Sequence, residues 1–335
     1  AERAALMGLP PASDVSAGGA GRLVRTADGW IALSLARSAD EALVPAWLEA
    51  PAPEGQEWDV VHDRAAGRTA AELVERASLL GLPCSVVGEV DDRRPAIATP
   101  IADAAPRPIS DTLVVDLASL WAGPLCADVL ARLGARLVTV ESTGRPDGGR
   151  LARRFFAALH GRSESVALDF GSATGRARLG QLLERADVVI EGSRPRALEQ
   201  LGFDVRELAR RGPQVWISIT SHGRDDTNRD RVGFGDDAAA AGGLVGWVDG
   251  TPRFVADAVA DPLTGLTAAV TAVELLERGG RWLVDVALAR CTAAATGGWI
   301  DTDTERWTAE RPRPRSDRGA SMPLGRDTDR IIREL

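Results

Sequence analysis

The side chains that could do chemistry in this sequence are mainly carboxylates and guanidinium groups. All 40 basic residues are arginine, and the chain contains no lysine and no tyrosine. This excludes a lysine Schiff base, a phosphate-loop lysine and a tyrosine acid as the basis of a mechanism. The cysteines and histidines are scattered, without the spacing of a disulfide framework or a zinc site. We therefore expect no metal, a reducing compartment, buried cysteines, and histidines that are structural or exposed. These residues are Cys84, Cys126, Cys291, His62, His160 and His222.

Acidic residues stand at or near the ends of short apolar runs in the middle of the chain. The runs span residues 113–117, 137–141, 165–169, 187–191 and 215–219. Because helix-like segments separate them, they predict a doubly wound, parallel, Rossmann-like α/β sheet. Ligands of such sheets bind beyond the carboxyl ends of the strands, so the loops there are the expected site. The acidic residues at these ends are Asp116, Glu141, Asp169 and Glu191.

The elements that must position these groups fall into three parts. We expect a small α/β domain with a linker over residues 1–105 and a large Rossmann-like domain over 106–300. The third part, residues 301–335, is expected to end in a helix that packs on the large domain.

The spacing of apolar residues, together with the glycines and prolines that interrupt it, predicts the individual helices and strands. In the first part these are a strand over 30–35, a helix over 69–80 stopped by Gly81, a strand over 84–90 and a linker over 91–110. Later come helices over 124–133, 176–185, 262–278 and 327–335, a strand over 281–288, and an irregular Arg/Pro-rich stretch over 310–321.

The bulk composition excludes some classes of function. The 40 basic and 48 acidic side chains give a formal net charge of −8, which argues against nucleic-acid binding. No apolar run reaches the roughly 18 residues of a membrane span. The first ten residues lack the basic and apolar regions of a secretory signal. We therefore expect a cytoplasmic protein that binds neither nucleic acid nor a membrane.

The loop after the first apolar run lacks the glycine motif of a dinucleotide-binding site. Residues 117–124 are Leu-Ala-Ser-Leu-Trp-Ala-Gly-Pro, with one glycine in place of G-x-G-x-x-G. A dehydrogenase that uses a nicotinamide cofactor would usually need the tighter glycine spacing. Such an enzyme is therefore a remote alternative.

A series of motifs in the second half of the chain points to one family. They are Val115-Asp116-Leu117 with Trp121-Ala122-Gly123-Pro124, LGARLVTVE at 133–141, SVALD at 165–169, ADVVIE at 186–191 with Arg194-Pro195, LEQLG at 198–202, ISITSHG at 217–223, ADPLTG at 260–265, and PLGRDTD at 323–329 with REL at 333–335. Together they resemble the class III CoA-transferases, the family of formyl-CoA transferase, carnitine-CoA transferase and α-methylacyl-CoA racemase. The resemblance covers about residues 109–290 and 322–335.

The order of the parts departs from the pattern of this family. Residues 28–33, the predicted helix over 69–80 and residues 81–84 resemble pieces of the family's small domain. That domain usually lies between the two halves of the large one, whereas here it precedes the large domain. We therefore predict a member with rearranged domain order. The sequence also lacks a run of four glycines, which several family transferases place over the active site.

Asp261 is the candidate nucleophile. Taken alone, its place before Pro262 and a predicted helix is typical of a helix N-cap. The resemblance, carried here by Ala260 and by Thr264-Gly265, implies a catalytic aspartate instead. A carboxylate can attack a thioester to form a mixed anhydride and then an aspartyl-CoA thioester. The chain would thus move CoA from an acyl-CoA to a carboxylic acid, with CoA and acyl-CoA as substrates and no permanently bound cofactor.

The resemblance also implies a set of CoA-binding residues. They are Trp121, Ala122, Ser142, Leu168, Asp169, Phe170, Gly171, Gly192, Ser193, Arg194, Gln200, Val232, Gly233, Phe234 and Gly235. Without lysine, the CoA phosphates must be met by arginines and helix N-termini, and Arg194 is the first candidate. Arginines at 150, 153, 154 and 162 are others, although a solvated face is equally consistent with them. Stacking on a ligand and packing in the core remain open for the Trp121 indole.

Two other functions within the family stay open. A CoA-binding protein without transferase activity is consistent with the rearranged order and the missing glycines. A racemase is less favoured, because Phe234 occupies the place of the histidine in the racemases' Gly-His-Asp and cannot supply a proton. Asp236 and Asp237 lie nearby and keep that alternative in play. Family members form interlocked dimers, so a homodimer is expected.

Overall fold

The chain forms two compact units. The computed structural model describes residues 2–212, 214–296, 313–314, 320 and 322–334. The first unit comprises residues 1–95, 221–261 and 287–314, and the second comprises 96–220, 262–286 and 315–335. Segments 221–261 and 287–314 thus belong to the first unit, although they follow the second unit's strands in the sequence. The pattern of apolar runs does not predict this division. The domain boundaries expected from the sequence, at residues 1–105, 106–300 and 301–335, remain a prediction.

The first unit is built on a three-stranded antiparallel sheet in the order β1-β2-β3. Its strands are β1 (Gly21–Arg25), β2 (Trp30–Ser34) and β3 (Cys84–Val86). Its helices are α1 (Glu2–Met7), α2 (Ser38–Leu48), α3 (Glu57–Ala65), α4 (Ala70–Leu80), α10 (Gly235–Ala241) and α12 (Leu288–Thr296). A hairpin of β10 (Val245–Val248) and β11 (Thr251–Phe254) completes the unit.

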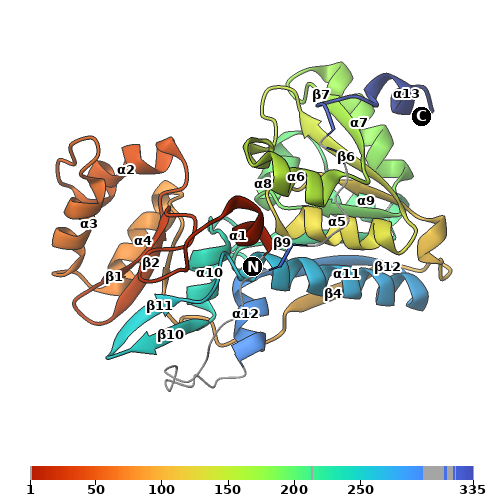
Figure 1. Ribbon diagram of the computed structural model, residues 1–335. Coiled ribbons are helices and arrows are strands. Elements are labelled where there is room, and N and C mark those ends of the chain that lie inside the picture. The colour runs from red at the N-terminus through yellow and green to blue at the C-terminus, as the bar shows by residue number, and fades with distance from the viewer. Residues whose placement is uncertain (1, 213, 297–312, 315–319, 321, 335) are drawn as a thin grey trace. The chain divides into compact units, whose positions relative to one another are not determined.

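The small sheet is buried on both faces because its residues alternate between two cores. Ile31 and Leu33 of β2 join the apolar core that contains residues of α2, α3 and α4. Ala32 points the other way and joins Leu23 and Ala240 of α10. Figure 1 shows α10 beside β2.

The sequence predicts most of this unit's early elements correctly. The strand over 30–35 is confirmed as β2, and the helix over 69–80 as α4. The Thr69 hydroxyl caps that helix by accepting a hydrogen bond from the Glu72 N–H, and Gly81 ends it with a φ of +72°. The strand over 84–90 is real but shorter, since β3 ends at Val86.

The second unit contains a seven-stranded sheet in the order β4-β12-β9-β8-β5-β6-β7. The five apolar runs become β5 (Leu113–Asp116), β6 (Arg136–Ser142), β7 (Glu164–Leu168), β8 (Val188–Glu191) and β9 (Val215–Thr220). They pair in parallel, β5 with β6 and β8, β6 with β7, and β8 with β9. The predicted doubly wound α/β class is therefore confirmed.

The expected linker over 91–110 is wrong in its middle. Residues 96–102 form β4 (Ala96–Ala102), which pairs antiparallel with β12 (Arg281–Ala287) at the edge of the large sheet. An edge strand tolerates Pro100, which cannot donate a ladder hydrogen bond. Its proline and its three small alanines hide this strand in the sequence.

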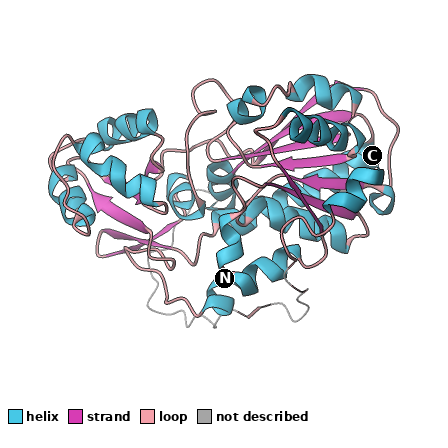
Figure 2. Ribbon diagram, turned by 90° about the horizontal axis from the view of Figure 1, so that it is seen from above, coloured by secondary structure: helices cyan, strands magenta, loops and turns pink. Residues whose placement is uncertain are grey.

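Helices lie on both faces of the large sheet (Figure 2). They are α5 (Ala122–Arg132), α6 (Arg153–His160), α7 (Ala173–Arg185), α8 (Pro195–Gln200), α9 (Val205–Arg211) and α13 (Thr328–Glu334), with short 3-10 turns at Ile109–Asp111 and Gly148–Leu151. The predicted C-terminal helix is α13, which packs on β7 and buries Ile331. A long helix, α11 (Ala260–Arg278), begins in the first unit and continues in the second.

Most of the Arg/Pro-rich stretch over 310–321 lies outside the described residues. In the part of the chain that is described, no helix combines the length and apolarity needed to cross a membrane.

Candidate active site

The acidic residues at the strand ends of the second unit hold the loops that follow them. Asp116, Asp169 and Glu191 each accept a hydrogen bond from the backbone N–H two residues further on, at 2.9, 2.9 and 3.0 Å. Glu141 accepts one from the Asp147 N–H at 2.8 Å. Short polar side chains commonly stabilise turns in this way. These carboxylates therefore shape the expected binding loops rather than mark a ligand site directly.

A network between two of these loops fixes the entrance to α5. The Asp147 carboxylate accepts hydrogen bonds from the N–H groups of Leu120 and Gly149. Glu141, which holds the Asp147 N–H, forms an ion pair with Arg150. The Arg150 guanidinium also donates to the Met322 carbonyl at 2.9 Å. Arg150, one of the arginines considered for CoA, therefore has a structural role here.

The Asp116 carboxyl is fully buried at the end of β5. Burial, with a smaller contribution from the negative charges of Asp147 and Glu141, raises its pKa to about 8. Its Oδ1 accepts the Ala118 N–H, whereas its Oδ2 has no hydrogen-bond partner. At neutral pH this group is therefore mostly a neutral carboxylic acid.

This buried acid makes the stability of the chain depend on pH. The folded protein keeps the Asp116 proton up to about pH 8, whereas the unfolded chain loses it near its ordinary value, so stability falls as pH rises between about 4 and 8. Asp116→Asn removes this loss while its Oδ1 can still accept the Ala118 N–H. We expect the unfolding free energy of Asp116→Asn, relative to wild type, to rise by about 1.4 kcal/mol per pH unit in this window.

Urea titrations of both proteins at pH 5, 6, 7 and 8 measure this difference, because the other titrating groups are common to both. Asp103→Asn, at an exposed aspartate, controls for the change in net charge. A difference that stays constant from pH 5 to pH 8 would contradict the prediction.

Trp121 is packed in the core of the second unit. Its side chain is 3% exposed, and its ring meets that of Phe155 edge to face with centroids 4.9 Å apart. The core-packing alternative for its indole therefore holds in this structure. The preceding residue, Leu120, is half-exposed and left-handed, with a φ of +69°. A non-glycine residue in this conformation is strained, and such residues cluster at functional sites.

The other CoA-binding candidates of this unit lie where β6, β7 and β8 end, and the adjoining helices begin or end. Ala122 begins α5, Ser142 ends β6, Leu168 ends β7, and Gln200 ends α8. Asp169, Phe170 and Gly171 form the turn into α7, whose N-terminus is capped by the Ser172 hydroxyl. Gly192, Ser193 and Arg194 follow β8 and are exposed. The parallel sheet thus brings the residues that end or follow its strands to one edge, as the topology requires; Gln200, at the far end of α8, is not placed there by this rule.

Asp261 lies in the first unit, in the first turn of α11. The helix begins one residue earlier, at Ala260, so the side chain is not at the cap position before the helix. Its N–H donates to the Ala258 carbonyl at 3.0 Å. Gly235, at the start of α10, leaves room for the carboxylate, because a Cβ at Gly235 would lie 2.3 Å from Asp261 Oδ2.

The surroundings of Asp261 disfavour its charged form. Burial and, to a smaller extent, the charges of Asp236, Asp237 and Asp257 raise its pKa to about 7, against the opposing positive charge of Arg3. The result is a poorly solvated carboxyl group that is about half ionised at neutral pH and mostly ionised above it. Perturbed groups of this kind mark candidate functional sites.

The stretch Val232–Gly235 leads into α10 in the same unit. Phe234 directly precedes α10, and the Arg37 guanidinium lies 5.7 Å from its ring centroid. Asp237 is fully buried, and its Oδ1 accepts the Phe234 N–H and the Ser34 hydroxyl, each at 2.9 Å. Asp236 accepts the Ala258 N–H at 2.8 Å. Both aspartates that kept the racemase alternative open are therefore engaged within the chain.

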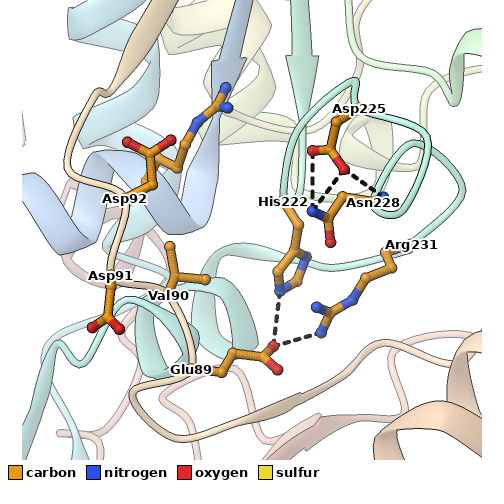
Figure 3. A pocket seen from close by; sticks show the side chains of 9 residues that line it. Glu89, Val90, Asp91, Asp92, His222, Asp225, Asn228 and Arg231 are labelled. Carbon is orange, nitrogen blue, oxygen red and sulfur yellow. Dashed lines mark hydrogen bonds and ion pairs between the residues drawn. The ribbon is translucent and has the colours of Figure 1, made fainter.

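A polar pocket of about 250 Å³ also lies in the first unit and was not predicted from the sequence. Figure 3 shows the Glu89 carboxylate between the His222 imidazole and the Arg231 guanidinium, 3.3 and 2.5 Å away. His222 is buried, and burial lowers its pKa. This histidine is therefore structural, as expected, and the pocket's central charges are paired with each other.

With the geometry in place, comparison with known proteins decides the family. The sequence profile of CoA-transferase family III matches residues 109–325, which is more than half of the chain. The chain belongs to this family. The family III match contains Asp261 and every CoA-binding candidate, whereas residues before 109 lie outside it.

Relatives with names and structures support this membership. The chain is 30% identical to the succinyl-CoA–D-citramalate CoA-transferase of Chloroflexus aurantiacus over 188 residues, which are 52% of this chain and 47% of the relative. It is 27% identical to a probable fatty acyl-CoA transferase of Mycobacterium tuberculosis over 62% of this chain and 57% of the relative. A CaiB/BaiF family protein from Brucella suis superposes with a TM-score of 0.51 and 27% identity, over 57% of this chain and 56% of that one. The chain spans about half the length of the curated relatives that it matches.

Proposed function

We propose that this protein is a CoA-transferase that moves CoA from an acyl-CoA to a carboxylic acid, with Asp261 as the nucleophile. The observation that carries the proposal is the setting of Asp261. In a chain of CoA-transferase family III, this carboxylate stands in the first turn of α11, where burial above all raises its pKa to about 7.

The reaction proceeds through four acyl transfers. The Asp261 carboxylate attacks the thioester carbonyl, which gives a mixed anhydride and CoA thiolate. The thiolate attacks the aspartyl carbonyl of the anhydride, which gives an aspartyl-CoA thioester and releases the donor acid as its carboxylate. The acceptor carboxylate then attacks the aspartyl carbonyl of this thioester, which gives a second mixed anhydride and releases the thiolate again. Finally the thiolate attacks the acceptor's carbonyl, which forms the new acyl-CoA and restores Asp261. No proton is gained or lost overall.

The electrostatic setting suits these steps. Only the ionised carboxylate can attack, so turnover should rise with pH through about 7. Poor solvation makes the carboxylate more nucleophilic, because little water must be removed from it before attack. The first turn of a helix also favours a negative charge.

CoA itself is assigned to the carboxyl edge of the large sheet. The exposed Arg194 after β8 and the N-terminal turn of α7 are suited to its phosphates, since guanidinium groups and helix N-termini bind anions. CoA and acyl-CoA act as substrates in this proposal. The homodimer, the rearranged domain order and the cytoplasmic location stay predictions of the sequence.

A transfer assay with defined pairs tests the proposal. The donors are succinyl-CoA, acetyl-CoA and formyl-CoA, and the acceptors are D-citramalate, L-malate, glutarate and oxalate, following the names of the relatives. We expect at least one pair to give the acceptor's CoA thioester, detected by liquid chromatography and mass spectrometry.

Two other outcomes would overturn the proposal. Tight binding of CoA thioesters without transfer for any pair would favour the binding protein. Solvent deuterium entering the position next to the thioester carbonyl, without transfer, would favour the racemase.

A further inference from the structure

An arginine near the N-terminus lies beside the proposed nucleophile. Arg3 of α1 holds Asp257 with both arms of its guanidinium, with Nε 3.0 Å from Oδ2 and the second nitrogen on Oδ1. The Asp257 side chain is 2% exposed and that of Arg3 is 28% exposed. Gly18 leaves room for this pair, because a Cβ there would lie 3.4 Å from the guanidinium. Arg3, Gly18, Asp257 and Asp261 all belong to the first unit.

The turn that Arg3 holds is strained. Ala256 and Ala258, on either side of Asp257, have φ angles of +60° and +43°. Alanine avoids this left-handed region, at a cost of about 1–2 kcal/mol per residue. Such a turn persists only where its surroundings fix it. Here Arg3 fixes the Asp257 side chain, and Asp236 accepts the Ala258 N–H at 2.8 Å.

The same turn leads directly into the helix that carries Asp261. The Ala258 carbonyl accepts the Asp261 N–H at 3.0 Å. A short series of contacts therefore runs from the Arg3 guanidinium through Asp257 and Ala258 to the backbone of Asp261.

Arg3 also contributes a positive charge where several negative ones meet. The pKa of Asp261 is raised mainly by burial; among its charged neighbours Arg3 lowers this pKa, whereas Asp236, Asp237 and Asp257 raise it. These groups come from α1, from α10 and from the turn before α11.

We propose that Arg3 is a positioning residue for Asp261: it fixes the strained turn before α11 and offsets the negative charge of the three neighbouring aspartates. This inference rests on the proposed function, in which Asp261 must be ionised and correctly placed to attack. Arg3 itself touches no reacting atom in this scheme.

The test compares Arg3→Met, Arg3→Lys and a matched control. Arg132→Met is the control, because Arg132 is 30% exposed and pairs with Asp128, which is 1% exposed. The first readout is the pH profile of kcat for CoA transfer. In Arg3→Met we expect the midpoint to rise by about one pH unit. At pH 6.5 kcat should then fall about tenfold, and at pH 9 it should recover to within about threefold, with KM for acyl-CoA little changed. Arg3→Lys should stay close to wild type, and Arg132→Met should not move the midpoint.

The second readout does not need activity. Carbon-13 labelling of aspartate carboxyl groups gives an NMR titration of Asp261, whose signal is identified by its loss in Asp261→Asn. We expect a midpoint near 7 in wild type and a higher one in Arg3→Met. Arg3→Lys keeps the test usable if Arg3→Met does not fold. An Asp261 titration midpoint in Arg3→Lys that equals the wild-type value supports the role of the positive charge.

The outcomes separate the two proposals. If the protein transfers CoA but neither midpoint moves in Arg3→Met, or kcat falls equally at every pH, the role of Arg3 is overturned. If the Asp261 titration moves as expected but no variant or wild-type protein transfers CoA, the proposed function fails and the role of Arg3 in the charge balance stands.

Discussion

Asp261→Asn is expected to lower kcat for CoA transfer by at least about 10³-fold. Asparagine has nearly the same shape but cannot form the mixed anhydride, so the reaction loses its covalent intermediate. Binding of acyl-CoA should be kept, because the change replaces a partly buried carboxylate with a neutral group of the same size. Initial rates and isothermal titration with acyl-CoA measure the two effects separately.

The stability of Asp261→Asn distinguishes lost chemistry from lost folding. The raised pKa of Asp261 means that wild type loses stability as pH rises from about 4 to about 7. The asparagine variant has no such loss, so at pH 8 it should be at least as stable as wild type. Asp14→Asn, at an exposed aspartate of the first unit, should keep full activity. A folded Asp261→Asn variant with more than a tenth of wild-type kcat would contradict the assigned role.

Gly235→Ala is expected to lower kcat by about 10²-fold while the fold persists. The added Cβ would lie 2.3 Å from Asp261 Oδ2 and 2.7 Å from both the Cβ and the carbonyl oxygen of Ala258. Heavy atoms do not approach this closely, so either the carboxylate or the strained turn must move. A displacement of about 1 Å at a reacting group can cost about 10²-fold in rate.

A second glycine of the same unit provides the control. At Gly246, on β10, an added Cβ has nothing within 4 Å. Gly246→Ala should therefore keep wild-type kcat and KM. If Gly235→Ala also keeps wild-type kcat, the close approach of α10 to Asp261 has no bearing on turnover.

The parts of the fold that repeat a local pattern could be predicted from the sequence. The strands β5 to β9 were visible because each is a short, largely buried apolar run between helical segments. The helix α4 was visible because Thr69 and Gly81 mark its two ends. The edge strand β4 was missed because an exposed strand with a proline carries neither an apolar run nor a clear alternation.

The site was only partly predictable, because only some of its residues lie in a recognisable local pattern. Asp261 was found through the motif around it, and the strand-end acids through their positions. The backbone contacts of these acids do not follow from position alone: Asp116 and Glu191 each accept a hydrogen bond from the N–H two residues further on. Arg3 could not be found at all, since 254 residues separate it from Asp257 and no spacing rule joins them.

The most direct measurement of the central claim is a search for the covalent intermediate on Asp261. The protein is incubated with an acyl-CoA that it binds, then treated with hydroxylamine or with borohydride, digested, and analysed by mass spectrometry. We expect the peptide that contains Asp261 to carry the hydroxamate after hydroxylamine and the reduced alcohol after borohydride. Neither mark should appear in Asp261→Asn or when acyl-CoA is left out. If a donor that demonstrably supports transfer leaves this peptide unmodified, or marks another carboxylate instead, Asp261 is not the nucleophile.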